Sequence, residues 1–281
     1  MSERALANRQ APVCSVSMPI ARTLQHWSML AGDGFLPGIP HAMSPQAPAT
    51  NQLIDRLPAA AAQSLLAACE SIALEFDQAV AEAGAPIERV LFPTTAIISV
   101  TARVDDHNPL EMGVIGFEGM LGATLALGVK VHPLPAVVQG SGQALQIPAA
   151  AFRRQLSDSP ALEQLVHGYL FVLVEQLSQT AACNAFHEVA ARLARWLLMM
   201  DDRARSQPLV LTHLFLSGML GVRRSAVTIA AGHLQEQQLI RYARGHIQVL
   251  SRPGLEAVAC GCYPAGVAAY ERQFAPSSRK P

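Results

Sequence analysis

The feature that most constrains the fold is a helical pattern that extends over about residues 152–200. Part of it repeats apolar residues at alternating steps of four and three, which is the spacing of a coiled-coil seam. A second apolar stripe, formed by Leu165, Tyr169 and Val172, runs beside the first. One helix with two apolar stripes needs two partners. The seam that we expect at a dimer interface contains Val166, Leu170, Leu173, Leu177 and Thr180.

The same pattern has a simpler explanation, in which the helix is buried inside one chain and both stripes contact that chain. We favour the dimer, because a compact β domain that precedes the helix can cover only one of the two stripes. A second amphipathic pattern begins at Val189 and ends before Pro208, where Asp201 and Asp202 interrupt it.

The composition excludes several classes of protein. Apolar residues make up 51% of the 281 residues and charged residues 15%, which is incompatible with a disordered chain. Lys and Arg together number 21, as do Asp and Glu, so an anionic partner has to bind at a local basic patch. No uncharged stretch is long and unbroken enough for a membrane span or a signal peptide. We therefore expect a cytoplasmic protein.

Short apolar segments alternate with turn residues in the first half of the chain. Residues 89–93, 97–103, 110–115, 136–139 and 143–147 are separated by Pro, Gly, Asp or Asn, as in a small all-β body with tight turns. The residues before them, from Asn51 to Ile72, follow a helical spacing, with Pro58 opening a second helix. This organisation predicts an α+β protein with a β-roll.

The domain boundaries follow from these changes of pattern. We expect an N-terminal β-roll (jelly-roll-like) sensor domain, a long dimerisation helix and a C-terminal winged helix–turn–helix domain. The predicted segments are a flexible N-terminal extension at 1–48, the β-roll sensor domain at 49–152, the dimerisation helix and hinge at 153–186, the winged helix–turn–helix domain at 187–265 and a C-terminal tail at 266–281.

Residues 212–240 have the pattern of a helix–turn–helix. Thr212 is placed to cap the first helix, Gly221 to form the tight turn and Val222 to fill the gap between the helices. The second helix would bury Val227, Ala230, Ala231 and Leu234. Its polar residues near the N-terminus would then face outward, where such a helix enters the major groove of DNA.

Residues 239–250 alternate as a hairpin after this helix, which is the arrangement of a wing. Five Arg and one Glu lie between residues 212 and 252, so the module is basic although the whole chain is neutral. A basic helix–turn–helix predicts binding to double-stranded DNA. The residues that we expect at the DNA are Thr212, Arg223, Arg224, Ser225, Thr228, Arg241 and Arg244.

Three stretches give the chain a specific resemblance. The segments FPTTAIIS at 92–99 and GFEGM at 116–120 resemble an effector domain. The segment CNAFHEVAARLARWLL at 183–198 resembles a hinge with its following helix, and LGVRRSAV at 220–227 resembles a DNA reader. Together they make the chain similar to the Crp–Fnr family of bacterial transcription regulators. The resemblance implies a homodimer on an inverted-repeat operator, with RNA polymerase as a further partner and no enzymatic activity.

The chain departs from the cyclic-nucleotide-binding branch of that family. In those relatives a Gly-Glu pair contacts the ribose and an Arg contacts the phosphate. Here Met120 follows Gly119, Glu118 is displaced, and no Arg lies between residues 103 and 153. A buried phosphate without such donors would be poorly compensated. We therefore do not expect cyclic AMP to bind. The effector pocket indicated by the resemblance would contain Glu118, Met120 and Leu121.

No residue pattern predicts a cofactor or a metal centre. Cys14 is isolated from other cysteines, so an N-terminal iron–sulfur cluster is not expected. Cys260 and Cys262 form a single pair that could bind a metal or react with oxidants, but a structural role is favoured. His107 and His132 are expected in solvated loops.

Two functions therefore remain open. The first is a sequence-specific transcription regulator with a β-roll sensor. The second is a small-molecule or redox sensor that acts through another protein, with the helix–turn–helix as a protein contact. An enzyme is disfavoured, because the sequence contains no recognisable nucleophile–base pair.

Overall fold

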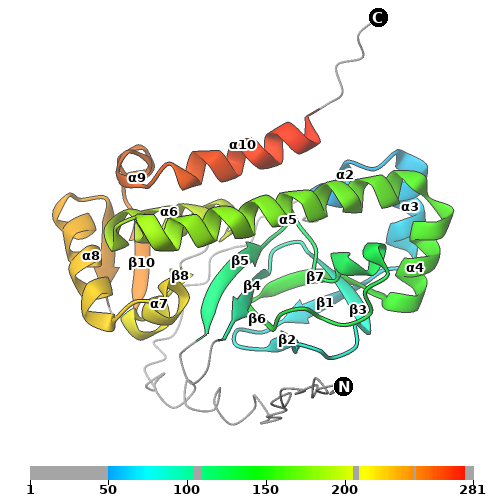
Figure 1. The fold of residues 1–281 in the computed structure, drawn as a ribbon, viewed down its shortest axis with the longest axis horizontal. Helices are drawn as coiled ribbons and strands as arrows, with labels where there is room; N and C mark the ends of the chain where they lie inside the picture. Colours follow the sequence, from blue (N-terminus) through cyan, green and yellow to red (C-terminus); the bar gives the residue numbers. More distant parts are fainter. Residues whose placement is uncertain (1–49, 104–108, 205–208, 244, 276–281) are drawn as a thin grey trace, which may run out of the picture. The chain divides into compact units, whose positions relative to one another are not determined.

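The computed structural model describes residues 50–103, 109–204, 209–243 and 245–275. The expected N-terminal extension, with Cys14, and the expected loop residue His107 lie outside these residues. Figure 1 shows a β-sheet body, a long helix that passes over it, and a mainly helical C-terminal part. The predicted α+β class and the order of its parts are confirmed.

The β-roll consists of two antiparallel sheets that enclose an apolar core. The larger sheet has the order β2 (Ala79–Ala81), β6 (Ala136–Gly140), β4 (Ile97–Ala102) and β5 (Leu110–Ile115). The smaller has the order β1 (Glu70–Leu74), β7 (Gly142–Pro148) and β3 (Arg89–Pro93). Leu74, Leu91, Ile98, Ile115 and Val138 are buried together between the sheets. Alternation along each strand directs these residues inward.

One prediction in this region was wrong. Ile72 was assigned to a helical pattern, but it lies in β1, where it pairs with Ala144 of β7. The helix α3 (Ala59–Ala67) has already ended with Ala68 as its C-cap. Ile72 follows Leu65 by seven residues, which fits a helix, but Ile72 and Leu74 also have the spacing of a strand. Ile72 lies in a strand rather than in a helix because it pairs with β7.

The predicted long helix is interrupted near its start. It is divided into α4 (Ala149–Asp158) and the 27-residue α5 (Pro160–Phe186). Ser159 caps α5 by accepting a hydrogen bond from the backbone nitrogen of Leu162, and Pro160 supplies a first-turn residue that needs no donor. A short helix α2 (Gln52–Asp55) and a 3-10 helix η1 (Ala123–Leu127) complete this half.

The C-terminal half surrounds a second apolar core, to which Ile97 of β4 and Val114 of β5 also contribute. The structure has a helical hairpin and a three-stranded sheet of order β8-β10-β9 between flanking helices. Leu193, Leu197, Leu216, Val227 and Ile240 are fully buried in this core. The elements are α6 (Val189–Ala204), β8 (Leu209–Val210), α7 (His213–Leu220), α8 (Arg224–Glu236), β9 (Ile240–Ala243), β10 (His246–Val249), α9 (Arg252–Val258) and α10 (Cys262–Phe274).

The described part of the expected C-terminal tail at 266–281 is helical as far as Phe274. Its described residues continue α10, which packs along α5 (Figure 1). An Arg272–Glu175 ion pair of 2.9 Å joins the two helices. The Tyr270 hydroxyl donates to the backbone oxygen of Glu118 at 2.8 Å. The amphipathic character of α10, in which Ala269 is buried, was overlooked because small residues carry little hydrophobic signal.

A buried polar contact joins the β-roll to α6. The indole nitrogen of Trp196 donates to Glu111 Oε1 at 2.7 Å, and Ser99 Oγ lies 2.6 Å from Glu111 Oε2. Ser99 Oγ is also 2.9 Å from Gln139 Oε1. The single Ser99 proton can serve only one of these two oxygens. A protonated Glu111 can donate to Ser99 and leave the Ser99 proton for Gln139. Burial raises the pKa of Glu111 to about 7.

Among the described helices, none is long and apolar enough to cross a membrane by itself. Only the bent pair α7 and α8, with 106° between its helices, has enough combined length and apolar content.

The substitution Glu111→Gln should change how stability depends on pH. The folded pKa of Glu111 is raised, so its contribution is fully present below the ordinary pKa of 4.5 and is lost as the pH rises through about 7. Between pH 5 and 8, the wild type should lose about 2–3 kcal/mol more unfolding free energy than the variant. Urea unfolding at both pH values measures this, with Glu82→Gln on the surface as the control. Equal losses in wild type and Glu111→Gln would contradict the assignment.

Candidate nucleic-acid interface

The first helix of the helix–turn–helix, α7, has the predicted start and end. The Thr212 hydroxyl accepts a hydrogen bond from the backbone nitrogen of Phe215 at 3.1 Å and so caps the helix. Gly221 follows the last turn in the left-handed conformation, with φ of 62°. The most deeply buried residue of α7 is Leu216, which the sequence analysis did not identify as a core residue.

Gly221 is required for a second reason. A Cβ at this position would lie 2.8 Å from Leu110 Cδ1 at the start of β5. The turn therefore passes close to the β-roll, and only a glycine fits both the backbone conformation and the space. Val222 is partly buried and packs against the C-terminal core, as expected of the residue between the helices.

The second helix, α8, separates an apolar face from a polar face as predicted. Val227, Ala230, Ala231 and Leu234 are all buried on the inner side. Figure 1 shows α8 at the edge of the C-terminal part, with α7 beside it. On the outer side, the four predicted residues near the N-terminus of α8 are exposed. They are Arg223, Arg224, Ser225 and Thr228.

An apolar residue that sequence reasoning missed lies on the same outer face. The Ile229 side chain is 61% exposed, although isoleucine is usually buried. It follows Ser225 by four positions, so the side chains of Ser225 and Ile229 lie on the same side of the helix. The sequence could have indicated this exposure, because the predicted inner face of the helix does not include Ile229.

The predicted wing is a hairpin of β9 and β10, with β8 paired on the other side of β10. Tyr242 fixes the hairpin to the helices: its hydroxyl donates to the Leu211 carbonyl at 3.1 Å, and its backbone nitrogen donates to Gln235 Oε1 of α8 at 2.8 Å. Arg241 on β9 is exposed. Arg244, which was also predicted to contact DNA, lies outside the described residues.

A contact between α7, α8 and the wing passes through His213. Its ring stacks on Tyr242 with 4.4 Å between the ring centres, and its Nδ1 lies 3.0 Å from Thr228 Oγ1. Burial lowers the pKa of His213, and the nearby Arg224 guanidinium lowers it further. A neutral imidazole is therefore favoured, which limits like-charge repulsion beside Arg224.

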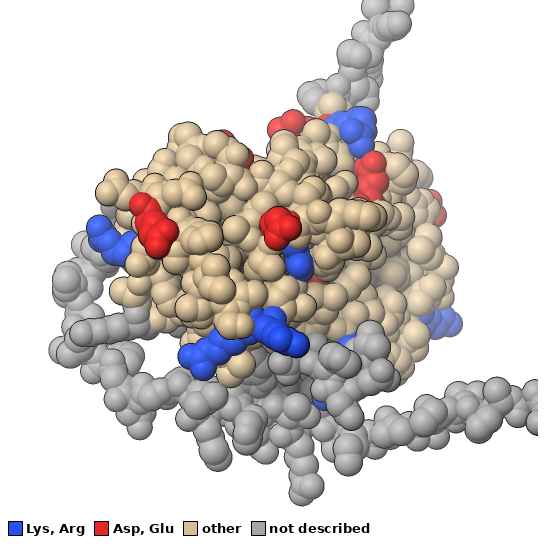
Figure 2. Space-filling view, turned by 60° about the vertical axis from the view of Figure 1, so that its left-hand side comes forward, with Lys and Arg blue, Asp and Glu red and all other residues tan. Residues whose placement is uncertain are grey.

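The basic residues of the module differ in their availability. Arg223, Arg224 and Arg241 are exposed, and Figure 2, in which this end comes forward, shows basic side chains grouped along its lower edge. Arg252, which was counted in the basic module, instead forms ion pairs with Asp201 at 2.8 Å, Asp202 at 2.5 Å and Glu256 at 3.0 Å. Its charge is therefore largely neutralised within the subunit.

The five residues of the predicted dimer seam divide into two groups. Val166 and Thr180 are buried within the subunit, 1% and 8% exposed, whereas Leu170, Leu173 and Leu177 are partly buried. The most exposed large apolar residues in the middle of α5 lie one position beyond the seam, at Phe171 and Val174, which are 53% and 60% exposed. The covering elements are the β-roll on one side and α10 on another, and α10 was not foreseen as a partner.

The predicted effector residues do not line a common pocket. Met120 and Leu121 are buried in the core, at 1% and 8% exposure. Of the three predicted residues, Glu118 is the one that lines a cavity of about 330 Å³, which lies between the β-roll loop, α5, α6 and α10. Its carboxylate is held by Arg203 of α6 at 2.7 Å. His132, expected in a solvated loop, is 7% exposed, and burial lowers its pKa.

The structure also gathers four residues that the sequence did not connect. Cys183, His187, Cys260 and Cys262 place their sulfur and nitrogen atoms within 4.8 Å of one another. Cys183 and His187 are four positions apart at the end of α5, which was a detectable spacing. The group could not be recognised from the sequence, because Cys183 and His187 are far along the chain from Cys260 and Cys262.

Comparison with known proteins agrees with this geometry. Residues 191–258 match the family model of the Crp-like helix-turn-helix domain. This part of the chain is a Crp-like helix-turn-helix domain. The match begins in α6 and ends at the last residue of α9, so it includes the reader helix and the wing. A search of curated protein sequences finds no match.

The fold of the Crp-like domain together with the β-roll is also shared with solved structures. FixK2 from Bradyrhizobium japonicum is 14% identical with a TM-score of 0.59, and the match covers 69% of this chain and 98% of that one. The c-di-GMP-responsive global regulator CLP from Xanthomonas campestris is 16% identical, with a TM-score of 0.57 and coverage of 69% and 100%. TTHB099, a CRP-family transcriptional regulator from Thermus thermophilus, is 17% identical, with a TM-score of 0.57 and coverage of 67% and 96%. The chain therefore has the Crp/Fnr fold.

The substitution Gly221→Ala should destabilise the Crp-like domain. Alanine at a positive φ costs about 1–2 kcal/mol, and its methyl group would displace Leu110. Gly232→Ala in α8 is the matched control, because a Cβ there meets no atom within 4 Å, and it should stabilise the helix by about 0.5–1 kcal/mol. Urea unfolding of the full chain measures both. Equal effects of the two substitutions would refute the role of the Gly221 turn.

Proposed function

We propose that this protein is a sequence-specific DNA-binding transcription regulator that reads the major groove with the N-terminal half of α8. The observation that carries the proposal is the outer face of that helix, where Arg224, Ser225, Thr228 and Ile229 are exposed side by side. A subunit that used this helix for internal packing would bury such a face.

Three of these side chains, those of Arg224, Ser225 and Ile229, have a suitable partner on DNA. Arg224 can donate two hydrogen bonds to guanine O6 and N7, which distinguishes guanine by about 1–3 kcal/mol. Ser225 can donate to or accept from a base edge, and Ile229 can contact a thymine methyl group. Arg223 precedes the helix, where its charge adds to the positive end of the helix dipole and favours a phosphate.

The wing and the cap extend the contact to the DNA backbone. Arg241 of β9 is exposed, and Thr212 is exposed at the start of α7. We assign both to phosphate contacts, together with Arg244, which the sequence pattern also predicts at the DNA. Phosphate contacts position a reader without specifying sequence, so these residues contribute to affinity and to its dependence on salt.

We further propose a homodimer on an inverted-repeat operator. Phe171 and Val174 leave an apolar surface on α5 that a second α5 can cover, next to the partly buried Leu170, Leu173 and Leu177. Val166 and Thr180 would then pack within the subunit and not at the dimer contact. A symmetric dimer presents two copies of α8, which matches half-sites about one helical turn apart.

The effector is proposed to be a molecule other than cyclic AMP. Glu118 pairs with Arg203 and is not available to a ribose, and no Arg lies between residues 103 and 153 to bind a buried phosphate. RNA polymerase is the further partner that a transcription regulator of this fold would contact. Interaction of the helix–turn–helix with a protein remains the alternative, and the experiment below separates the two.

The substitution Arg224→Ala should weaken binding to duplexes selected from random DNA by the wild type. We expect a loss of about 1–3 kcal/mol, with relaxed base preference at one position in each half-site. Arg154→Ala, which removes an exposed Arg from α4 in the β-roll half, is the control and should leave affinity unchanged. Fluorescence anisotropy at two salt concentrations measures affinity and its salt dependence.

Two results would contradict this assignment. Unchanged affinity and specificity of Arg224→Ala would show that α8 does not read the bases. Absence of salt-dependent duplex binding by the wild type would favour the protein-contact alternative.

The substitution Val174→Glu should dissociate the dimer. Burying a carboxylate at the proposed α5 contact should raise the dimer dissociation constant at least about 30-fold, equivalent to about 2 kcal/mol. Gln164→Glu adds the same charge at an exposed position near the start of α5 and should leave the dimer intact. Sedimentation velocity over a range of protein concentrations measures this. A monomeric wild type, or a Val174→Glu variant that dimerises normally, would refute the proposed interface.

A further inference from the structure

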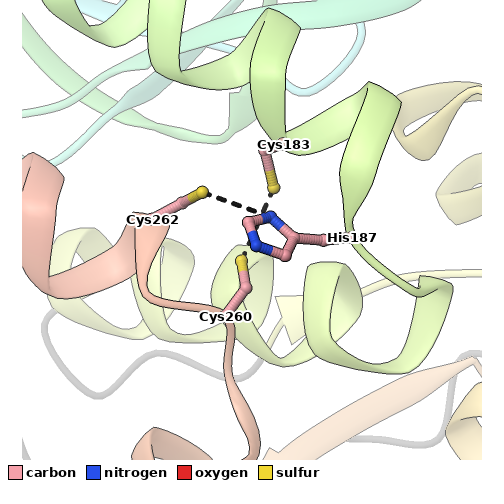
Figure 3. Close-up of side chains that lie close together, drawn as sticks. All are labelled: Cys183, His187, Cys260 and Cys262. Carbon is pink, nitrogen blue, oxygen red and sulfur yellow. Dashed lines mark hydrogen bonds between the residues drawn. The ribbon is translucent and has the colours of Figure 1, made fainter.

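Four residues from two distant parts of the chain meet at the end of α5. Cys183 lies in the last turn of this helix and His187 is its C-cap, while Cys260 and Cys262 lie at the junction of α9 and α10. Figure 3 shows the three sulfurs around the imidazole of His187. We propose that Cys183, His187, Cys260 and Cys262 bind one zinc ion, which ties the end of α5 to the start of α10.

The distances fit a tetrahedral site. The sulfurs of Cys183 and Cys260 are 3.5 Å apart, and Cys262 Sγ lies 3.4 Å from His187 Nδ1. All four ligand atoms lie within 4.8 Å of one another. Ligands at about 2.0–2.3 Å from a tetrahedral zinc ion are separated by about 3.3–3.8 Å, so small side-chain movements complete the coordination.

The ligand types select zinc. Thiolate and imidazole ligands favour zinc over magnesium and calcium, which prefer oxygen. Three Cys and one His form one of the closed ligand sets of structural zinc sites, with no position left for water. Cys183, Cys260 and Cys262 are buried, and His187 is on the exposed side, which provides a path by which the ion can enter.

The surroundings also support a charged centre. Arg192 is 7% exposed and lies close enough to Cys183 and Cys260 to interact with them electrostatically. Among the described residues it has no carboxylate partner, although its guanidinium donates to Asn184 Oδ1 at 2.7 Å and to the Leu220 carbonyl. A buried cation needs compensation. Three thiolates, a neutral imidazole and Zn²⁺ carry one net negative charge, which supplies it.

A further hydrogen bond orients one of the ligands. Gln179 Nε2 donates to Cys262 Sγ at 2.8 Å. Donors of this kind stabilise a thiolate and fix its direction toward a metal. The backbone nitrogen of Cys260 bonds to the Ala191 carbonyl at 3.4 Å, which holds the α9–α10 junction against α6.

The zinc ion would act as a link between the end of α5 and the junction of α9 and α10. Its ligands, from Cys183 to Cys262, close a loop of the chain that contains the whole Crp-like domain. The free energy of zinc binding at such a site contributes directly to the stability of the fold. The link fixes α10 along α5 beside the hinge that leads into α6. The proposal does not depend on DNA binding, because it concerns metal content alone.

The test uses the full-length protein without an affinity tag, purified under reducing conditions without chelators. Elemental analysis should give one zinc per chain. Replacement of zinc by cobalt should produce the intense visible absorption of tetrahedral cobalt with thiolate ligands, which reports the site in the unmodified sequence and needs no variant. The protein should also unfold at a lower temperature after the metal is removed, and recover when zinc is returned.

The variants Cys260→Ser and Cys262→Ser should lose stoichiometric zinc, and Cys69→Ser should retain it. Cys69 is the matched control because it is partly exposed and lies in the β-roll half, outside the cluster. Gln179→Ala should keep the fold and weaken zinc binding about 10–100-fold.

Four results would overturn the proposal. They are a wild type that binds no zinc after reconstitution, stoichiometric iron in place of zinc, cobalt without thiolate absorption, and a disulfide between Cys183 and Cys260 in the freshly purified protein.

Discussion

The packing of α5 is the constraint on which the other parts depend. Leu162, Val166 and Tyr169 bury one stripe of this helix against the β-roll core, and Gly168 leaves room for the side chain of Gln273 from α10 on another side. In its middle, a helix covered on these sides retains a narrow apolar surface at Phe171 and Val174. The position of α5 therefore determines where the β-roll packs, where α10 packs and which surface is left for a second subunit.

Both apolar and polar contacts join the β-roll to the Crp-like domain, and Ile97 and Val114 of the β-roll are buried in the apolar core of the C-terminal half. Glu111 bonds to Trp196, Glu118 pairs with Arg203, and Gly221 lies against Leu110. Polar buried contacts have strict geometric requirements, so they hold the two parts in one arrangement only while every partner is satisfied. Glu111 illustrates this, because its protonation state decides how the Ser99 proton is shared. An effector or a change of pH that altered these contacts would act directly on α6, which carries the reader.

Much of the architecture and of the reader followed from local pattern. All five predicted strands of the β-roll and both helices of the helix–turn–helix occur where turn residues and apolar spacing placed them. Gly221, Thr212 and the inner face of α8 act within a few residues of themselves, which is why local pattern was sufficient. The errors have a different origin. Ile72 satisfied two periodicities, and only pairing with β7 chose the strand. The helix α10 is rich in alanine and glycine, so its apolar face was too weak to detect without α5 beside it.

The sequence by itself determined the order of the domains, the reader helix and the set of residues that it presents to solvent, since each depends on short-range spacing and backbone conformation. Tertiary structure decided which of the charged and sulfur-containing residues are available. Arg252 is neutralised by acidic side chains of α6 and α9, Glu118 is held by Arg203, and Cys183 meets Cys260 across the fold. These pairings join residues far apart in the chain, and no local rule specifies them, because they arise only when separate elements pack against one another.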